Sequence, residues 1–217
     1  MHTKQEKIWN FKQARPNRWE AENELPMYRL ETCGICCALM LLELYGRTQY
    51  PTPKQKHKLY DLYRWKSFKG TTGPALAKLL AWNGLRVRLL QSFRNLPENR
   101  DGYFSPELYE LLKQEWQNWT AACGENVQIE TCADLSCDTL KQELDKGRQA
   151  IVQILVPGNA DGIHDHTLHW VVVYGFRGET FLVCDPNSTK RHLSREEMEA
   201  YMDTPIGRIF LTVEEGR

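Results

Sequence analysis

The pattern of apolar and polar positions divides the chain into a helix-rich first part and a strand-rich last third. At Thr32 a polar beginning gives way to the dense apolar stretch TCGICCALMLLELYG. Thr32 is a suitable N-cap residue, and Gly46 is a typical C-terminal stop. The stretch predicts a helix over residues 33–45 that is apolar nearly all round, and such a helix lies buried at the centre of a domain.

Helical and strand patterns follow one another along the rest of the chain. The spacing of apolar residues predicts further helices over residues 53–66, 75–84, 105–122, 137–147 and 194–202. Short runs rich in Val, Ile, Phe and Tyr predict strands over residues 85–90, 126–130, 149–156, 168–176, 179–185 and 207–213. Helices first and a mainly antiparallel sheet second indicate the α+β fold class.

The length of the chain suits one domain with a sizeable core. The protein has 217 residues, and two domains would both be small. Residues 1–26 are polar with scattered aromatic side chains, which indicates an N-terminal arm. We expect this arm to precede a single domain over residues 27–217.

Charge and hydropathy exclude several classes of partner. Lys and Arg number 28 and Asp and Glu number 28, so the formal net charge is zero. Proteins that bind nucleic acid through its phosphates usually carry a basic excess, so we expect no nucleic acid partner. No stretch of about 18 apolar residues could span a bilayer, and no basic run would dock on a membrane surface. The pattern gives no indication of oligomeric state.

The beginning of the chain lacks the apolar core of a secretory signal. We therefore expect a cytoplasmic protein, or one exported without a cleavable signal peptide. The seven cysteines include the crowded set Cys33, Cys36 and Cys37, which lie too close together on one helix for a disulfide framework. In a reducing compartment such thiols are reactive, metal-binding or buried. We interpret Cys36 and Cys37 as core residues.

Cys33 is the candidate nucleophile because it lies at the start of the predicted buried helix. The exposed N–H groups and the positive end of the helix dipole favour the thiolate over the thiol there. Only the thiolate is a good nucleophile toward a carbonyl carbon. Gly34 follows directly and leaves room for a substrate.

His169 and Asp185 are the candidate base and the residue that orients it. His169 lies in the apolar run HWVVVYG, where a histidine has no packing reason to occur. Asp185 comes sixteen positions later, at the end of the next predicted strand. A hairpin through Arg177 and Gly178 would lay the two strands side by side, and the two side chains would then meet at one end of the sheet. A nucleophile, a base and a third group that holds the base are the parts of a catalytic triad.

The order Cys, His, Asp, with CG opening a buried helix, then HWVVVYGF and CDP, resembles the papain-like cysteine peptidase superfamily. Within it, the chain is most similar to the bacteriocin-processing leader peptidases and their free-standing relatives. The segments MYRLETCGICCALMLLELYG, GTTGPALAKLLAWNGLRVRLL and LKQELDKGRQAIVQIL carry this resemblance, which runs from about Met27 to Val213.

The resemblance implies a papain-like fold, in which a helical half packs on a sheet half with the active site between them. It also implies cleavage of a peptide or amide bond in a peptide or protein substrate through a thioester, without a metal or other cofactor. Cys33 would attack, His169 would move the proton, and Asp185 would hold the imidazole. The backbone N–H of Cys33 would supply one half of the oxyanion hole.

One expected residue is missing. These enzymes usually carry a glutamine a few residues before the cysteine as the second oxyanion donor, and this chain has none there. Loss of such a donor typically costs roughly 100- to 1,000-fold in rate. Asn23, Tyr28 and Arg29 are candidate replacements.

Other interpretations of the same residues stay open at this point. Glutamine deamidation or acyl transfer would use the same three side chains, and a catalytically inactive papain-fold module could instead bind a peptide or protein. Cys33 could also be an ordinary buried cysteine. A zinc site is a weaker alternative, because His164, His166 and His169 have none of the usual structural zinc spacings and the C-x-x-C has no matching second pair.

Overall fold

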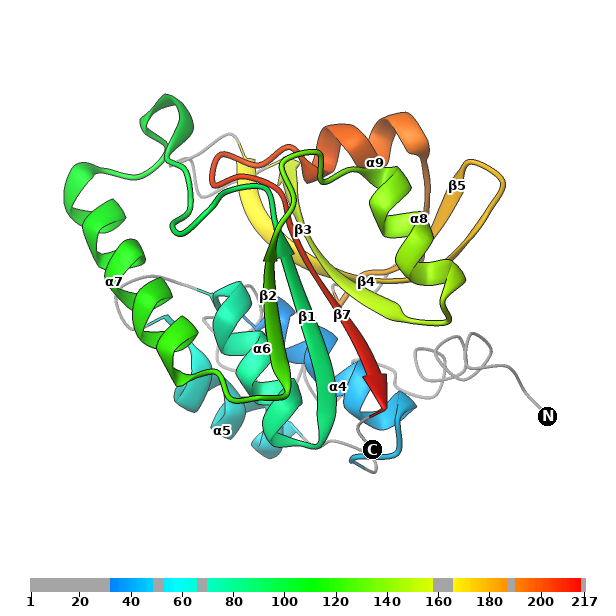
Figure 1. Cartoon of the computed structure of the whole chain (residues 1–217), viewed down its shortest axis with the longest axis horizontal. Helices are drawn as coiled ribbons and strands as arrows, with labels where there is room; N and C mark the ends of the chain where they lie inside the picture. The colour runs from blue at the N-terminus through cyan, green and yellow to red at the C-terminus, as the bar shows by residue number, and fades with distance from the viewer. Residues whose placement is uncertain (1–31, 49–52, 66–69, 158–165, 187–189, 216–217) are drawn as a thin grey trace.

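A seven-stranded sheet forms the centre of the computed structural model, which describes residues 32–48, 53–65, 70–157, 166–186 and 190–215 (Figure 1). The strand order is β2-β1-β7-β3-β4-β5-β6. Neighbouring strands are antiparallel except for β1 and β2, which are parallel. The strands are β1 Leu85–Gln91, β2 Val127–Thr131, β3 Gln149–Pro157, β4 His166–Arg177, β5 Thr180–Cys184, β6 Lys190–Ser194 and β7 Ile209–Glu215.

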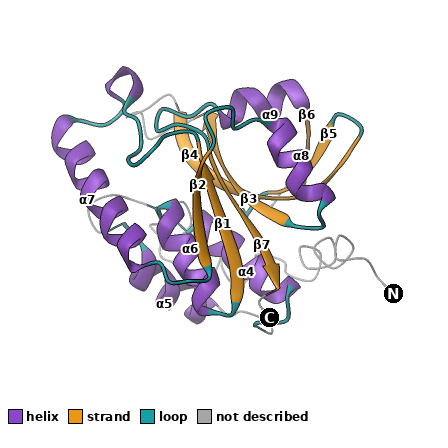
Figure 2. Cartoon of the chain, in the orientation of Figure 1, coloured by secondary structure: helices purple, strands orange, loops and turns teal. Residues whose placement is uncertain are grey.

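Helices cover both faces of this sheet (Figure 2). The described helices are α4 Cys33–Leu44, α5 Pro53–Tyr63, α6 Gly73–Trp82, α7 Pro106–Ala122, α8 Cys137–Asp145 and α9 Arg195–Met202, with a short 3-10 turn at Arg100–Gly102. Side chains of α4 to α7 share one apolar cluster with one face of the sheet, and α8 and α9 share a second cluster with the other. The predicted α+β fold class is confirmed.

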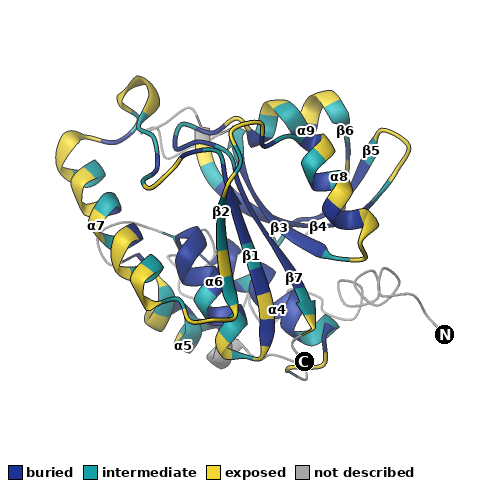
Figure 3. Ribbon diagram, viewed as in Figure 1, coloured by how far each residue is buried: buried dark blue, intermediate teal, exposed yellow. Residues whose placement is uncertain are grey.

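The middle strands are buried on both faces (Figure 3). In β4, Val172 packs in the cluster that contains α4, whereas Val171 and Val173 pack in the cluster that contains α8 and α9. Because successive side chains of a strand point to opposite faces, a strand covered on both sides is apolar at every position. This explains the continuous apolar run that the sequence shows in this segment.

The predicted buried helix is α4, and it packs tightly at its first turn. A Cβ atom at Gly34 would lie 3.1 Å from Leu76 Cδ1 and 3.1 Å from Trp170 Cδ1. Glycine at this position therefore lets the start of α4 approach α6 and β4 closely. The helix ends before Gly46, whose φ of 67° is in the left-handed region.

The structure adds two details around α9 and β6. The capping box of α9 is present, since Ser194 Oγ accepts from the Glu197 N–H and the Glu197 carboxylate accepts from the Ser194 N–H. The sequence prediction missed β6, because its residues are mostly polar and it is an edge strand, which among the described strands pairs with β5 alone. The predicted arm, residues 1–26, lies outside the described residues. Among the described helices, none has the length and apolar character that crossing a membrane requires.

Candidate active site

Cys33 is the first residue of α4 and is 8% exposed. Its sulfur receives hydrogen bonds from the backbone N–H groups of Gly34 and Trp170 and interacts with the side chain of His169. The α4 helix brings the thiol to the sheet because its apolar surface is buried against β3 and β4. The predicted position at a helix N-terminus is therefore the one observed.

His169 lies near the start of β4, where it pairs with Ile154 of β3. Its Nε2 atom is 2.9 Å from Asp185 Oδ1, and both side chains are buried. The second ring nitrogen, Nδ1, is then the one left for Cys33. Asp185 directly follows β5, whose last residue pairs with Val172 of β4, so the predicted hairpin brings the carboxylate back beside the histidine.

Arg191 also contacts the Asp185 carboxylate, and the sequence prediction missed this contact. Its Nε atom is 3.2 Å from Asp185 Oδ2, and its side chain is 38% exposed. The residue belongs to β6, and β6 pairs with β5 so that Arg191 lies opposite Val183. The only sequence signal for it was the polar segment KRHLS directly before the capping box of α9.

The electrostatics of Cys33 and His169 favour an ion pair. Burial alone raises the pKa of the Cys33 thiol, but the charge of His169 and hydrogen bonds from His169, Trp170 and Gly34 outweigh it, and the pKa lies below its ordinary value of 9.0. Burial alone lowers the pKa of His169, but the Cys33 charge and the contact with Asp185 raise it from 6.5 to about 10. Each group thus stabilises the charged form of the other.

Trp170 forms part of the wall beside the candidate triad. Its Nε1–H donates to Thr71 O at 2.9 Å, and its own carbonyl accepts from Cys37 Sγ at 3.3 Å. Both neighbours are buried. These contacts fix the backbone of β4 next to His169, so they also fix the N–H group that reaches the Cys33 sulfur.

Several predicted residues cannot be placed. Asn23, Tyr28, Arg29 and His164 lie outside the described residues, and the side chain of His166 is not described either. Within the described part of the chain, no three His, Cys, Asp or Glu side chains gather in a way that could hold a metal ion. All seven cysteines lie in that part, and none of them forms a disulfide.

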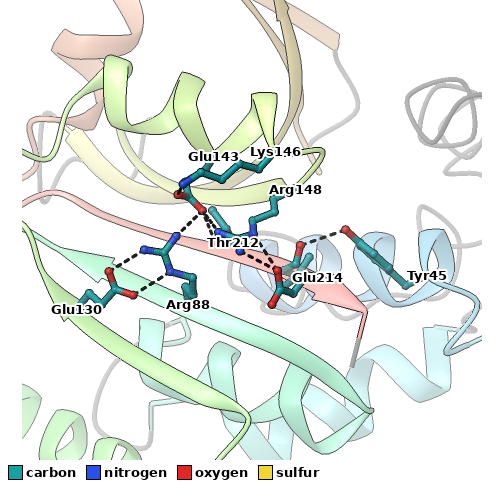
Figure 4. Close-up of polar contacts among 9 residues, drawn as sticks. Tyr45, Arg88, Glu130, Glu143, Lys146, Arg148, Thr212 and Glu214 are labelled. Carbon is teal, nitrogen blue, oxygen red and sulfur yellow. Dashed lines mark hydrogen bonds and ion pairs between the residues drawn. The ribbon is translucent and has the colours of Figure 1, made fainter. Parts of the chain in front are cut away.

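A second charged cluster lies on the other side of the sheet, around Glu143 of α8 (Figure 4). The Glu143 carboxylate accepts from Arg88 Nη1 at 2.6 Å, from Arg148 Nη1 at 2.6 Å and from Lys146 Nζ at 2.7 Å. Arg88 and Arg148 also pair with Glu130 and Glu214, respectively. The partners of Glu143, together with Glu130 and Glu214, border an open groove of about 750 Å³, and none of the three candidate catalytic residues lines it.

Despite its size, the groove is poorly suited to catalysis, because most of the charged side chains that border it are held in ion pairs. The guanidinium groups of Arg88 and Arg148 are each paired with two carboxylates. A saturated network of this kind holds α8 against β1 and β7. We therefore interpret the cluster as structural and take Cys33, His169 and Asp185 as the candidate active site.

Comparison with known proteins supports the cysteine peptidase interpretation at the family level. A family model described as the Peptidase_C39 like family matches residues 10–204 of the chain. No curated protein matches. A crystal structure of a proposed C39-like peptidase from Bacillus anthracis is similar over 87% of this chain and 91% of that chain, at 12% sequence identity and a TM-score of 0.41. At that level the structural likeness carries no further argument.

Proposed function

The chain belongs to the peptidase C39-like family, and we propose that it is a cysteine peptidase or amidase that cleaves a peptide or amide bond with Cys33, His169 and Asp185. The observation that carries this proposal is the arrangement of three buried groups. The Cys33 thiol has a lowered pKa beside His169, whose Nε2 atom is 2.9 Å from Asp185 Oδ1. A buried core histidine needs neither an adjacent thiolate nor a buried carboxylate.

The proposed reaction follows from these groups. The Cys33 thiolate attacks the carbonyl carbon, and the backbone N–H of Cys33 donates to the oxygen that becomes negative. Protonated His169 gives its proton to the leaving nitrogen, which departs as an amine and leaves a thioester on Cys33. His169 then takes a proton from water, whose oxygen attacks the thioester and releases the acid. Asp185 holds the imidazole ring in place throughout.

The substrate class is a peptide or a protein. The resemblance to the bacteriocin-processing leader peptidases supports removal of a leader from a co-produced peptide. We place this activity in the cytoplasm or, after export, outside the cell. The same thioester could also be reached from a glutamine side chain, with ammonia as the leaving group, or be resolved by an amine instead of water.

A peptide library incubated with the wild-type protein and with Cys33→Ala tests the proposal. We expect the wild type to produce new peptide ends, each cleavage adding one water, and Cys33→Ala to produce none. Deamidation would instead add about 1 Da without cleavage, and acyl transfer would add the mass of the amine; both use the thioester. If neither protein changes any peptide, the family fold would serve here as a binding module, as the missing upstream glutamine also suggests.

A further inference from the structure

Cys36, the second cysteine of the C-x-x-C at the start of α4, has no use in the proposed reaction. Cys33 is the first residue of the helix, and the backbone N–H of Cys36 donates to Thr32 O at 2.9 Å, so both cysteines lie on the first turn. A helix radius of about 2.3 Å and a rise of about 1.5 Å per residue place Cα atoms of residues i and i+3 about 5 Å apart. Disulfides span Cα separations of roughly 4.4–6.8 Å.

The contacts of Cys36 bring its thiol toward this end of the helix. Its Sγ atom lies 3.8 Å from Thr32 Oγ1, in agreement with the tendency of helical side chains to point toward the N-terminus. Cys36 is half-buried, whereas Cys37 is completely buried and donates from its Sγ to Trp170 O. Burial raises the pKa of Cys37, and the charges of Cys33 and Cys36 raise it further.

We propose that Cys33 and Cys36 are an oxidative modification site, at which a peroxide converts the two thiols into a reversible disulfide within the first turn of α4. The Cys33 thiolate attacks one peroxide oxygen, the O–O bond breaks, and the second oxygen leaves as water once protonated. The Cys36 thiol then attacks the Cys33 sulfenic acid, the S–O bond breaks, and a second water leaves. Two thiols are oxidised by two electrons, and one hydrogen peroxide is reduced to two waters.

The bridge requires a small tightening of the helix. Cβ atoms of residues i and i+3 lie about 5–6 Å apart, and a disulfide needs roughly 3.5–4.5 Å. The first turn can adjust because its leading N–H groups have no partner four residues earlier. Such a bridge is reversible rather than part of a disulfide framework. On the proposed function, it would block attack by Cys33 while sparing this thiol from irreversible oxidation.

Mass spectrometry of the full-length protein after treatment with hydrogen peroxide tests this modification site. Trypsin releases residues 30–47 as one peptide that contains Cys33, Cys36 and Cys37. We expect this peptide to lose about 2 Da, to carry an alkyl group on Cys37 alone after denaturing alkylation, and to regain both hydrogens with a dithiol reductant. In Cys36→Ser, Cys33 should proceed to the sulfinic acid, with roughly tenfold more irreversible oxidation than in the wild type.

Cys132→Ser is the matched control, because Cys132 is also half-buried but lies between β2 and α8. It should behave as the wild type does. A bridge from Cys33 to Cys37, no loss of about 2 Da, or equal irreversible oxidation in the wild type and Cys36→Ser would each overturn the proposal. The mass readout needs no peptidase activity. A bridge in a protein that cleaves nothing would therefore remove only the proposed function.

Discussion

Cys33 and Glu143 are both buried acids whose pKa is lowered, but their charges are stabilised by different kinds of partner. Burial raises the pKa of Glu143, while hydrogen bonds and charge from Lys146, Arg88 and Arg148 outweigh it and lower the pKa to about 2. The Cys33 thiolate depends chiefly on the single side chain of His169. Glu143 thus has three cationic partners, whereas Cys33 has one, the imidazolium of His169.

The difference separates a cluster that holds charge from a site that can move a proton. Two of the three cationic partners of Glu143 are arginines, which cannot be deprotonated in a protein. His169 can give its proton to a leaving group and take one back, because its second nitrogen stays on Asp185. The comparison predicts that changes at the two regions affect different measurements.

His169→Ala should have the largest effect. Without the imidazolium, burial dominates, and the pKa of the Cys33 thiol should return to its ordinary value of 9.0 or above. The rate of Cys33 alkylation by iodoacetamide at pH 6 should then fall by roughly 100-fold, since little thiolate remains. Mass spectrometry of each cysteine gives the rate, and the other six cysteines are internal controls. If Cys33 in the wild type reacts no faster than these six, the ion pair does not form.

Glu143→Gln should affect stability and leave Cys33 unchanged. The shift of the Glu143 pKa from 4.5 to about 2 corresponds to about 3 kcal/mol. We expect the free energy of unfolding in urea at pH 7 to fall by about this amount. Glu179→Gln, which removes a carboxylate with 65% side-chain exposure that pairs with Lys141, should lower this free energy far less, because exposed ion pairs contribute little. A change in the rate of Cys33 alkylation in Glu143→Gln would show that the Glu143 cluster affects the candidate active site and would contradict the independence of the two regions.

The two regions also differ in how far the sequence could predict them. Cys33, His169 and Asp185 could be proposed because local signals placed each one: a helix start, an apolar strand, and a hairpin with a glycine turn at Gly178, whose φ is 58°. The catalytic role that we give them remains a proposal. The contact of Asp185 with Arg191 could not be foreseen, because it depends on a polar edge strand.

The cluster around Glu143 had no local signal at all. Arg88, Glu143 and Glu214 lie in three distant segments, and only the strand order places them together. The helices and most strands were predicted because periodicity is a property of short segments. The parallel pairing of β1 with β2 and the position of β7 between β1 and β3 depend on contacts between distant parts of the chain, which periodicity does not encode.

The stability of the wild type should fall in acid because of Glu143. Its folded pKa of about 2 is below the ordinary 4.5, so its contribution is present above pH 4.5 and is lost as the pH falls toward 2. At pH 3 the loss should be about 2 kcal/mol. Urea unfolding at pH 7, 5 and 3 gives this difference, and Glu143→Gln should lack that part of the decline. An equal decline in both proteins would assign the acid sensitivity to other carboxylates.

Arg191→Met should have the smallest effect, and it tests whether the third member of the candidate triad needs a partner of its own. The Arg191 guanidinium lies 3.2 Å from Asp185 Oδ2, on the side of the carboxylate away from the His169 contact. A positive charge there fixes the carboxylate and adds to the potential that favours the Cys33 thiolate. Without this charge, the pH at which Cys33 alkylation reaches half of its maximal rate should rise by roughly half a pH unit.

The size and sign of this shift distinguish positioning from simple packing. Arg191→Lys keeps the positive charge, so its half-maximal pH for Cys33 alkylation should lie close to that of the wild type. If Arg191 served in packing alone, Arg191→Met would lower the stability of the fold without changing this pH. Arg195→Met is the matched control, because the Arg195 side chain has 40% exposure against 38% for Arg191 and pairs with Asp138 and Glu179 instead. If Arg191→Met and Arg195→Met give the same pH profile as the wild type, Asp185 orients His169 without help from β6. In that case the only side chains on which the Cys33 thiolate depends would be those of His169 and Asp185, among the described residues, and the contrast with the three cationic partners of Glu143 would be sharper.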